Sequence, residues 1–335
     1  MSVGSLNAPK NGGTHLARLT PRDESLFVEA AWLYYHDGLN QNQIAARMRI
    51  SRASVVNYLN EARARDWVRV HLDSDVFRGH RLAADLCRAY GLLDALVVPD
   101  DTTGPETAAA SVSRVTRAAA DWLPRLLEPG DRLGVSWGAT VYQMAQQVPY
   151  TPVPDLTVIQ LLGSRPAAPG FEAEACTSML AHRLGGQCVN LHVPLVLSNR
   201  DLRDALCDEP VVRGQLEALS DCNKTVLACG TCDADAHVVR SGILGADSMA
   251  DYRAKGAVGV VCGRLIDGNG QPVFAPVEER MIGVSLEHMR GKEMGLLVAG
   301  GPDRARPACA AIKGGFVTHL ATSTQIAQDL LEMAI

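Results

Sequence analysis

Three polar side chains near the N-terminus have the chemistry that reads the edges of DNA bases. Arg52, Ser54 and Asn57 fall on the outer side of an expected helix whose apolar residues, Val55 and Leu59, point inward. An arginine can donate two hydrogen bonds to guanine, an asparagine can pair with adenine, and a serine can bond to either base. The same side chains could instead form the solvated face of an ordinary three-helix bundle.

The helices that would position these side chains are marked by their caps. Asn40 precedes a helix with Gln43 three residues on, which is the spacing of a capping box, and Ser51 caps the next helix. An earlier helix, with apolar residues at helical spacing, ends near Gly38. Two capped helices joined by a tight turn predict a helix-turn-helix over residues 41–61, with its second helix in the major groove. The candidate DNA-contacting residues are Gln41, Gln43, Ser51, Arg52, Ser54, Asn57 and, as a phosphate contact, Arg63.

The remainder of the chain has a different pattern, so two domains are expected. Residues 1–20 are polar and predict a flexible tail, residues 21–73 form the helix-turn-helix domain with a short strand or wing over 67–72, and residues 74–79 are the linker. Residues 80–335 alternate helices with short apolar strands, which predicts a doubly wound α/β domain with a mostly parallel sheet. The expected strands are 93–98, 132–135, 156–161, 225–228, 258–261, 296–299 and 318–321, and the expected helices are 81–90, 106–127, 140–147, 172–184, 211–219, 246–255 and 306–314.

Glycine-containing loops follow four of these strands. Ligands of open α/β sheets bind beyond the carboxyl ends of the strands, so these loops should converge on one edge. Glycines permit close backbone approach, while hydroxyls, N–H groups and arginines could hold a sugar or phosphate. Each loop alone could be merely a tight turn. Together they predict a pocket for a polyol or anionic sugar, with candidate residues Ser136, Gly138, Thr140, Gly163, Ser164, Arg165, Arg264, Asp267, Gly301 and Arg304.

Nine cysteines, an odd number at irregular spacing, indicate free thiols in a reduced compartment. Cys229 and Cys232 form a CxxC pair, which could be a redox couple or half of a metal site. No second such pair accompanies it, and Cys222 and His237 are the nearest additions, so a glycine loop of small residues is the favoured interpretation. No GxSxG, HExxH or phosphate-binding loop motif is present, and no catalytic residue, cofactor or metal is expected.

The charge distribution separates the two domains. The whole chain has a net charge of −5. Residues 1–72 carry roughly +3, which leaves roughly −8 for the rest, so the head is suited to phosphate and the body is not. Neither a signal peptide nor a membrane span is recognisable, and a cytoplasmic protein without a membrane partner is expected.

Together these motifs resemble the SorC/DeoR-type sugar-responsive bacterial transcription regulators. The residues that carry the resemblance are 38–45 and 50–52 in the head, and 134–140, 159–163, 256–267, 281–283 and 298–301 in the body. The resemblance implies an effector domain related to ribose-phosphate isomerase and glucosamine-phosphate deaminase folds. It also implies a homotetramer, and a carbohydrate or its phosphate as inducer.

Three departures from the family pattern bear on the chemistry. Arg304 and Leu162 stand where members of the family have lysine, which argues against a covalent imine. Thr322, Ser323 and Thr324 replace an acidic stretch, which weakens a catalytic interpretation. The run at 161–164 is more similar to the erythritol-type polyol regulators than to the sugar-bisphosphate regulators.

The resulting expectation is a ligand-controlled repressor or activator of a carbohydrate or polyol operon, not an enzyme. The head would read half of a palindromic operator, and assembly through the body would supply the second head. Two alternatives stay open at this point: a sugar-phosphate isomerase or deaminase with a DNA-binding head, and a redox or metal sensor built on Cys229 and Cys232.

Overall fold

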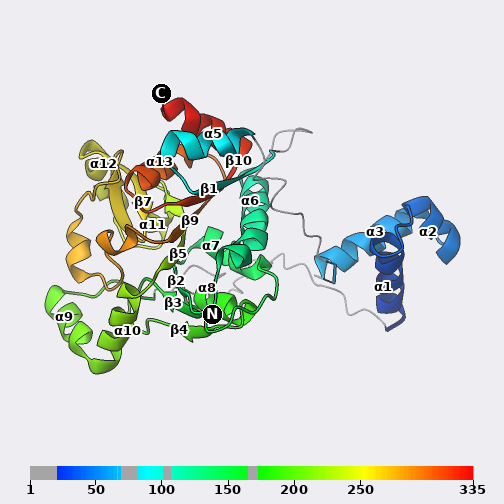
Figure 1. The fold of residues 1–335 in the computed structure, drawn as a ribbon, viewed down its shortest axis with the longest axis horizontal. Helices are drawn as coiled ribbons and strands as arrows, with labels where there is room; N and C mark the ends of the chain where they lie inside the picture. The colour runs from blue at the N-terminus through cyan, green and yellow to red at the C-terminus, as the bar shows by residue number, and fades with distance from the viewer. Residues whose placement is uncertain (1–20, 66, 69–80, 101–106, 165–172, 335) are drawn as a thin grey trace, which may run out of the picture. The chain divides into compact units, whose positions relative to one another are not determined.

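The computed structural model describes residues 21–65, 67–68, 81–100, 107–164 and 173–334 (Figure 1). The chain separates into two compact units, residues 1–71 and residues 72–335. The predicted tail over 1–20, the linker over 74–79 and most of the predicted strand over 67–72 lie outside the described residues. None of the helices in the described ranges is both long enough and apolar enough to cross a lipid bilayer.

The described part of the N-terminal unit is a bundle of three helices: α1 (Pro21–Tyr35), α2 (Gln41–Met48) and α3 (Arg52–Ala64). Apolar side chains at helical spacing form its core, in which Ile44 and Val55 are fully buried. The predicted caps are confirmed, since the side chains of Asn40 and Ser51 accept hydrogen bonds from the first turns of α2 and α3. The first helix ends at Tyr35, and Gly38, with φ 71°, completes the turn that follows, in which the Leu39 N–H bonds to the Leu33 carbonyl at 3.0 Å.

The C-terminal unit is built on a seven-stranded sheet in which all neighbouring strands are parallel. The strand order is β1-β10-β9-β5-β2-β3-β4. The six predicted strands of this sheet are confirmed to within two residues at each end, and β4 was not predicted because it is short and largely exposed. The bounds are β1 (Asp94–Val98), β2 (Arg132–Val135), β3 (Thr157–Gln160), β4 (Gln187–Val189), β5 (Lys224–Leu227), β9 (Met294–Ala299) and β10 (His319–Ser323).

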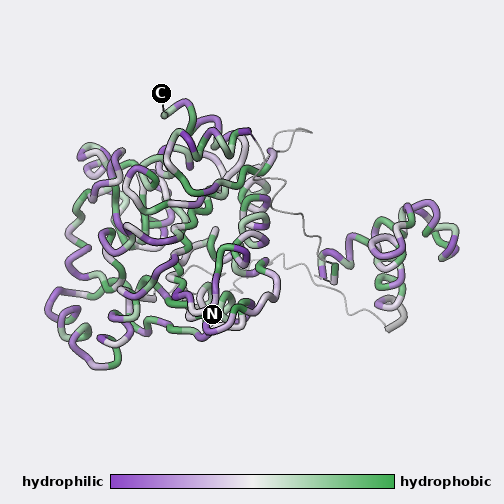
Figure 2. Tube along the Cα trace, viewed as in Figure 1, coloured by the Kyte–Doolittle hydropathy of each residue, from purple (hydrophilic) through white to green (hydrophobic). Residues whose placement is uncertain are grey.

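Helices cover both faces of this sheet, as its apolar strands require. Side chains alternate along β1, so that Leu96 and Val98 pack in the same core as α6, α7 and α8, while Ala95 and Val97 pack with α5, α13 and α14. Purple and green alternate along many of the helices in Figure 2, as expected of amphipathic helices with one buried side. The helices are α5 (Arg81–Tyr90), α6 (Ala108–Trp122), α7 (Ala139–Gln147), α8 (Ala173–Arg183), α9 (Arg200–Asp208), α10 (Pro210–Ser220), α11 (His237–Arg240), α12 (Ala246–Ala254), α13 (Ala305–Lys313) and α14 (Thr324–Met333).

The predicted strand over 258–261 does not belong to the parallel sheet. It is part of β7 (Ala257–Val261), the middle strand of a separate antiparallel sheet between β6 (Cys229–Gly230) and β8 (Arg264–Asp267). Only two residues, both with positive φ, connect β7 to β8, so the chain must reverse at that point. The expectation that this strand belongs to the parallel sheet is therefore corrected here.

Proline ends the long predicted helix over 106–127. The α-helix α6 stops at Trp122 and continues as the 3-10 turn η1 (Leu123–Leu126), with Pro124 in its first turn. Proline lacks the N–H that would continue the α-helical pattern, so the α-helix ends before it. Two further 3-10 turns are η2 (Pro276–Arg280) and η3 (Glu287–Met289).

Candidate functional site

A cavity of about 510 Å³ lies at the carboxyl edge of the parallel sheet. Ser136, Ala228 and Gly300 line it, and each is the residue immediately after β2, β5 or β9. These three strands are neighbours and run parallel, so their carboxyl ends meet at one place. The sequence correctly indicated this edge for the loops at Ser136 and Gly300.

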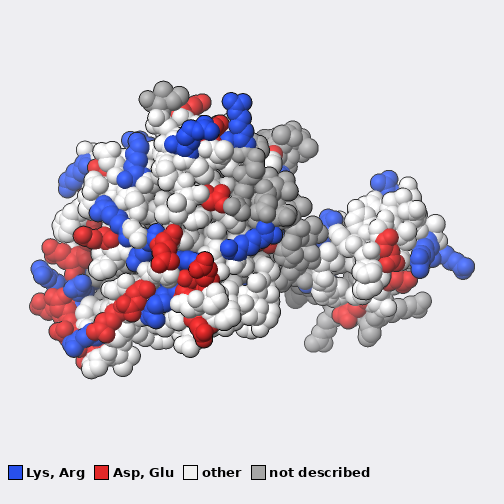
Figure 3. Space-filling model, in the orientation of Figure 1, with Lys and Arg blue, Asp and Glu red and all other residues white. Residues whose placement is uncertain are grey.

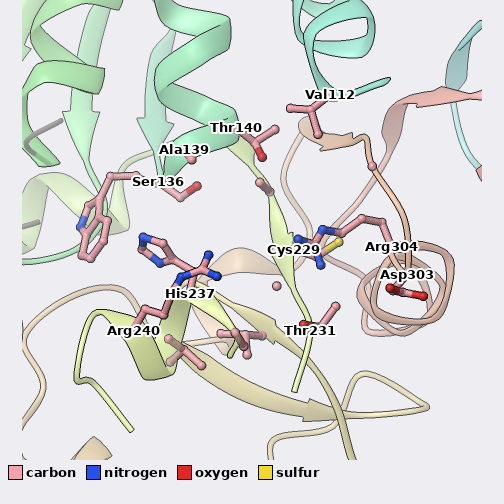
Figure 4. Close-up of a pocket in the computed structure, with 18 of the residues that line it drawn as sticks. Val112, Ser136, Ala139, Thr140, Cys229, Thr231, His237, Arg240, Asp303 and Arg304 are labelled. Carbon is pink, nitrogen blue, oxygen red and sulfur yellow. The ribbon is translucent and has the colours of Figure 1, made fainter. Parts of the chain in front are cut away.

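The loop from Ser136 to Thr140 forms one wall of the pocket. The N–H of Ser136 still bonds to the carbonyl of Val226 on β5 at 3.0 Å, which holds the loop against the sheet. Gly138 takes φ 153°, a conformation that favours glycine, and directly precedes α7. The hydroxyls of Ser136 and Thr140 lie on the same side of the pocket in Figure 4, close to the amino end of α7.

The loop from Gly300 to Arg304 forms a second wall. A Cβ on Gly300 would come within 3.0 Å of the Cα of Val112 on α6, so this close approach favours glycine. Gly301 takes φ 89°, and Arg304 then occupies the cap position of α13. Figure 4 shows the Arg304 guanidinium extending toward Cys229, with the Asp303 carboxylate on its far side.

A third wall comes from the segment after β6, which the sequence analysis did not include in the pocket. Thr231, His237 and Arg240 line the cavity there, together with the exposed Asp233 and Asp235. Figure 4 shows the Arg240 guanidinium beside the His237 ring. This segment follows β5 and the two-residue β6, so the position of a strand end was the signal that could have identified it.

His237 links two walls of the pocket. Its ring lies edge-on to that of Trp137, with the ring centroids 6.1 Å apart. The Trp137 ring N–H donates to the carbonyl of Gly163 at 3.2 Å. Burial lowers the pKa of His237, and the nearby positive charge of Arg240 lowers it further. The ring is therefore neutral at neutral pH.

Neither Arg240 nor Arg304 has a carboxylate partner within the described ranges, in contrast to Arg264, which is paired with Glu278. Acidic and basic side chains are interspersed on the face shown in Figure 3. On α9 and α10, Arg203 pairs with Asp204 at 2.6 Å and Arg213 approaches Asp208 at 3.6 Å. Unpaired guanidinium groups beside a cavity remain available to an anionic or hydroxyl-rich ligand.

Of the predicted effector residues, Ser136, Gly138, Thr140, Gly301 and Arg304 line the pocket. Gly163 and Ser164 lie outside its lining, because their loop packs against the neighbouring segment: Ser164 N–H bonds to the Val193 carbonyl at 2.7 Å, and a Cβ on Gly163 would come within 2.8 Å of Leu195 backbone atoms. Arg165 lies outside the described residues.

Arg264 and Asp267 also lie outside the lining, in correction of the sequence-based expectation. They begin and end β8 of the antiparallel sheet. Arg264 is committed to a buried ion pair with Glu278 at 2.6 Å and also donates to the Val284 carbonyl. Asp267 accepts the N–H groups of two residues in the following turn, so its carboxylate organises that turn.

The CxxC pair is buried and is not joined by a disulfide. Cys229 lines the pocket, Cys232 is 4% exposed, and both are free thiols. Burial raises the pKa of each to about 11, so both are protonated at neutral pH. The part of the chain that the structure describes contains no cluster of three metal-ligating side chains.

In the N-terminal unit, the predicted DNA-contacting residues fall into two groups. Arg52, Asn57 and Arg63 are exposed on α3. Ser51, Ser54 and Gln43 take part in helix caps: Ser51 Oγ accepts the Ser54 N–H at 3.0 Å, and Gln43 Oε1 accepts the Asn40 N–H at 2.9 Å.

Arg63 and Gln41 have partners on neighbouring helices. Arg63 Nε donates to the Tyr35 hydroxyl of α1, and its guanidinium lies over that ring. Gln41 Oε1 accepts a hydrogen bond from Arg52 Nε at 3.1 Å.

The fold and the site together define a class of protein. An α/β unit with a polar pocket at the carboxyl edge of its sheet is joined in one chain to a small bundle with two capped helices. Such a chain combines a small-molecule site with a separate helical module.

Comparison with known proteins agrees with this class. The family model described as "Putative sugar-binding domain" matches residues 74–332. The transcriptional regulator YjhU of Escherichia coli strain K12 is 36% identical over 306 residues, which are 91% of this chain and 93% of that protein. The deoxyribonucleoside regulator of Bacillus subtilis strain 168 is 30% identical over 310 residues, which are 92% of this chain and 97% of that protein.

A solved structure shares the fold. The full-length sorbitol operon regulator SorC of Klebsiella pneumoniae matches with a TM-score of 0.72 at 23% identity, over 92% of this chain and 98% of that one. The chain thus belongs to the SorC/DeoR-type family of transcriptional regulators that carry this sugar-binding domain.

Proposed function

We propose that the chain is a DNA-binding regulator of carbohydrate or polyol genes whose α/β unit binds the effector. The observation that carries the proposal is the pocket. Two guanidinium groups without a carboxylate partner among the described residues, Arg240 and Arg304, flank a cavity of about 510 Å³. A cavity of this size suits a small molecule.

The pocket lining favours a ligand with several hydroxyls and an anionic group. Ser136, Thr140 and Thr231 supply hydroxyls, and α7 and α13 direct their amino ends to the same cavity. Helix amino ends and arginines both favour negative charge. A sugar phosphate or polyol phosphate combines both features, and an unphosphorylated sugar or polyol supplies the hydroxyls alone.

The helical unit supplies the DNA-binding function in this proposal. It acts as a helix-turn-helix, with α3 in the major groove and Arg52, Ser54 and Asn57 toward the bases. The resemblance to the family supports a homotetramer that binds a palindromic operator in the cytoplasm, and an α/β unit related to ribose-phosphate isomerase and glucosamine-phosphate deaminase folds. The effector acts by binding two arrangements of the assembly with different affinity.

Thermal-shift screening of the full chain tests the pocket. The panel contains erythritol, sorbitol, deoxyribonucleosides and the phosphates of these compounds. A ligand that binds only the folded state raises the unfolding temperature. Isothermal titration of the best ligand then compares wild type with Arg304→Gln and with Arg253→Gln, a matched control at an exposed arginine outside the lining.

Loss of a charge-assisted contact at Arg304 should weaken binding roughly 10- to 150-fold, whereas the control should bind normally. Equal affinity of Arg304→Gln and wild type would remove Arg304 from the site. A panel in which no compound stabilises the chain would contradict the carbohydrate effector.

Binding without turnover is part of the proposal. His237 is a neutral imidazole in the pocket with Asp233 and Asp235 in the same lining, so acid–base chemistry deserves a direct test. Incubation of the purified chain with each stabilising ligand, followed by NMR, should show the ligand unchanged. Conversion would favour the isomerase or deaminase alternative.

A further inference from the structure

A hydrogen bond joins the first residues of α2 and α3. Arg52 Nε donates to Gln41 Oε1 at 3.1 Å, although the two residues are eleven positions apart. Gln41 is half-buried and Arg52 is exposed. The bond therefore fixes an exposed cation against the neighbouring helix.

Helix caps hold the backbone on both sides of this bond. Asn40 Oδ1 accepts the N–H groups of Asn42 and Gln43 at 3.0 and 3.1 Å, immediately around Gln41. Ser51 Oγ accepts the Ser54 N–H at 3.0 Å, which anchors the turn that contains Arg52. The two side chains thus extend toward each other from helix ends that are themselves well defined.

The bond leaves the outer edge of the guanidinium available. An arginine has five N–H groups, and the one on Nε is used here. The four on the two Nη atoms remain, and two parallel donors are what the O6 and N7 atoms of guanine accept. No carboxylate pairs with Arg52 in the described part of the chain.

Gln41 also keeps donors of its own. Its Oε1 is occupied by Arg52, but its Nε2 carries two N–H groups that a phosphate oxygen can accept. A glutamine with this arrangement can bind the DNA backbone and restrain the arginine that enters the groove. An unrestrained arginine would lose more conformational freedom on binding.

We infer that Gln41 is a positioning residue that orients Arg52 to read a guanine. The inference rests on the proposed DNA-binding function. It assigns one contact with a guanine to Arg52 of α3, and the selectivity of that contact depends on Gln41 of α2 as well.

Selection of binding sites from random duplex DNA tests this without a known operator. Full-length wild type, Gln41→Ala, Gln41→Glu and Arg52→Ala are each used for selection and sequencing, with Ser25→Ala as a control at an exposed position of α1. Thermal unfolding of each variant checks the fold. Affinities are then measured on the selected site and on the same site with that guanine replaced.

Arg52→Ala should reduce the preference for guanine at one position by roughly 5- to 150-fold. Gln41→Ala should relax the same position by roughly 2- to 12-fold, because the arginine must then be ordered on binding. Gln41→Glu keeps an acceptor for Arg52 but has no donor for phosphate, so it should keep the guanine preference while overall affinity falls. Ser25→Ala should match wild type.

Several outcomes would overturn the inference. A uniform loss of affinity in Gln41→Ala, with guanine preference intact, would make Gln41 a phosphate contact only. Relaxation of the preference at a different position in Gln41→Ala would make Gln41 a direct base contact. An unaltered guanine preference in Arg52→Ala would show that Arg52 does not contact the guanine. If wild type enriches no site, the proposed DNA-binding function fails, and the inference fails with it.

Discussion

Replacing Lys224 with methionine should destabilise the α/β unit by about 3 kcal/mol at neutral pH. Lys224 Nζ lies 2.8 Å from Asp131 Oδ2, and these side chains are only 8% and 6% exposed. Removing one partner of a buried ion pair typically costs about 3–5 kcal/mol, since the remaining charge is uncompensated. In the variant, the Glu128 N–H and Asn223 Nδ2 still donate to Asp131, at 2.7 and 2.8 Å. The expected loss of unfolding free energy is therefore at the lower end of this range.

The cost should depend on pH with a definite sign. Burial alone would raise the pKa of Asp131, but the Glu128 N–H, Lys224 and Asn223 together lower it below its ordinary value. Stability from the ionised carboxylate is therefore complete above the ordinary pKa of an aspartate and is lost as the pH falls through the lower folded value. Without Lys224 the carboxyl takes up a proton at a higher pH, so the deficit of the variant should shrink between about pH 7.5 and about pH 4.5.

Urea unfolding followed by circular dichroism measures this difference at both pH values. Lys313→Met, at an exposed lysine of α13, is the matched control and should change stability by less than about 0.5 kcal/mol. A cost below about 1 kcal/mol for Lys224→Met, or an equal cost at both pH values, would refute the reasoning. Ligand affinity should be unaffected, since the pair lies at the amino ends of β2 and β5, at the edge opposite to the pocket.

Three further predictions concern backbone packing in the α/β unit, the pocket and the helical unit. Gly163→Ala should lower the free energy of unfolding by about 1–3 kcal/mol, because the new Cβ would meet Leu195 backbone atoms at 2.8 Å. The control Gly214→Ala, in a helix with open space around the residue, should be neutral or stabilising. If Gly214→Ala destabilised the chain more than Gly163→Ala in thermal unfolding, the packing argument would be wrong. Burial lowers the pKa of His237, so the contribution of the neutral ring to stability is complete above about pH 6.5 and declines below it. Unfolding of His237→Gln measured against pH should lack that decline. A profile identical to that of wild type would show that His237 does not cause the decline. Asn40→Ala should destabilise the helical unit by about 0.5–2 kcal/mol in thermal unfolding, and an unchanged melting of that unit would show that the cap is dispensable.

Local chemistry made much of this structure predictable. The caps at Asn40 and Ser51 were readable because a side-chain oxygen bonds to backbone only two or three residues away. Most strands of the parallel sheet were readable as short apolar runs, since both of their faces are buried. β4 was not, because it is three residues long and largely exposed, and α14 was not, although Ser323 caps it.

The candidate pocket was only partly predictable, for a physical reason. Ser136 and Arg304 were found because a glycine loop after an apolar strand marks a strand end. Arg264 met the same criterion, yet its strand belongs to the antiparallel sheet and its guanidinium is paired with Glu278. Which arginine is paired depends on residues distant in sequence, and no local pattern reports that.

The sequence by itself determined the helix pair with its caps, the α/β pattern of the larger unit, and the loops from which a site could be built. These depend on contacts within a few residues, or on burial that hydrophobic patterning records. The tertiary structure alone decided which strands share a sheet, that Arg240 and His237 join Arg304 around one cavity, and that Gln41 holds Arg52. Each of these depends on long-range packing that brings distant segments together.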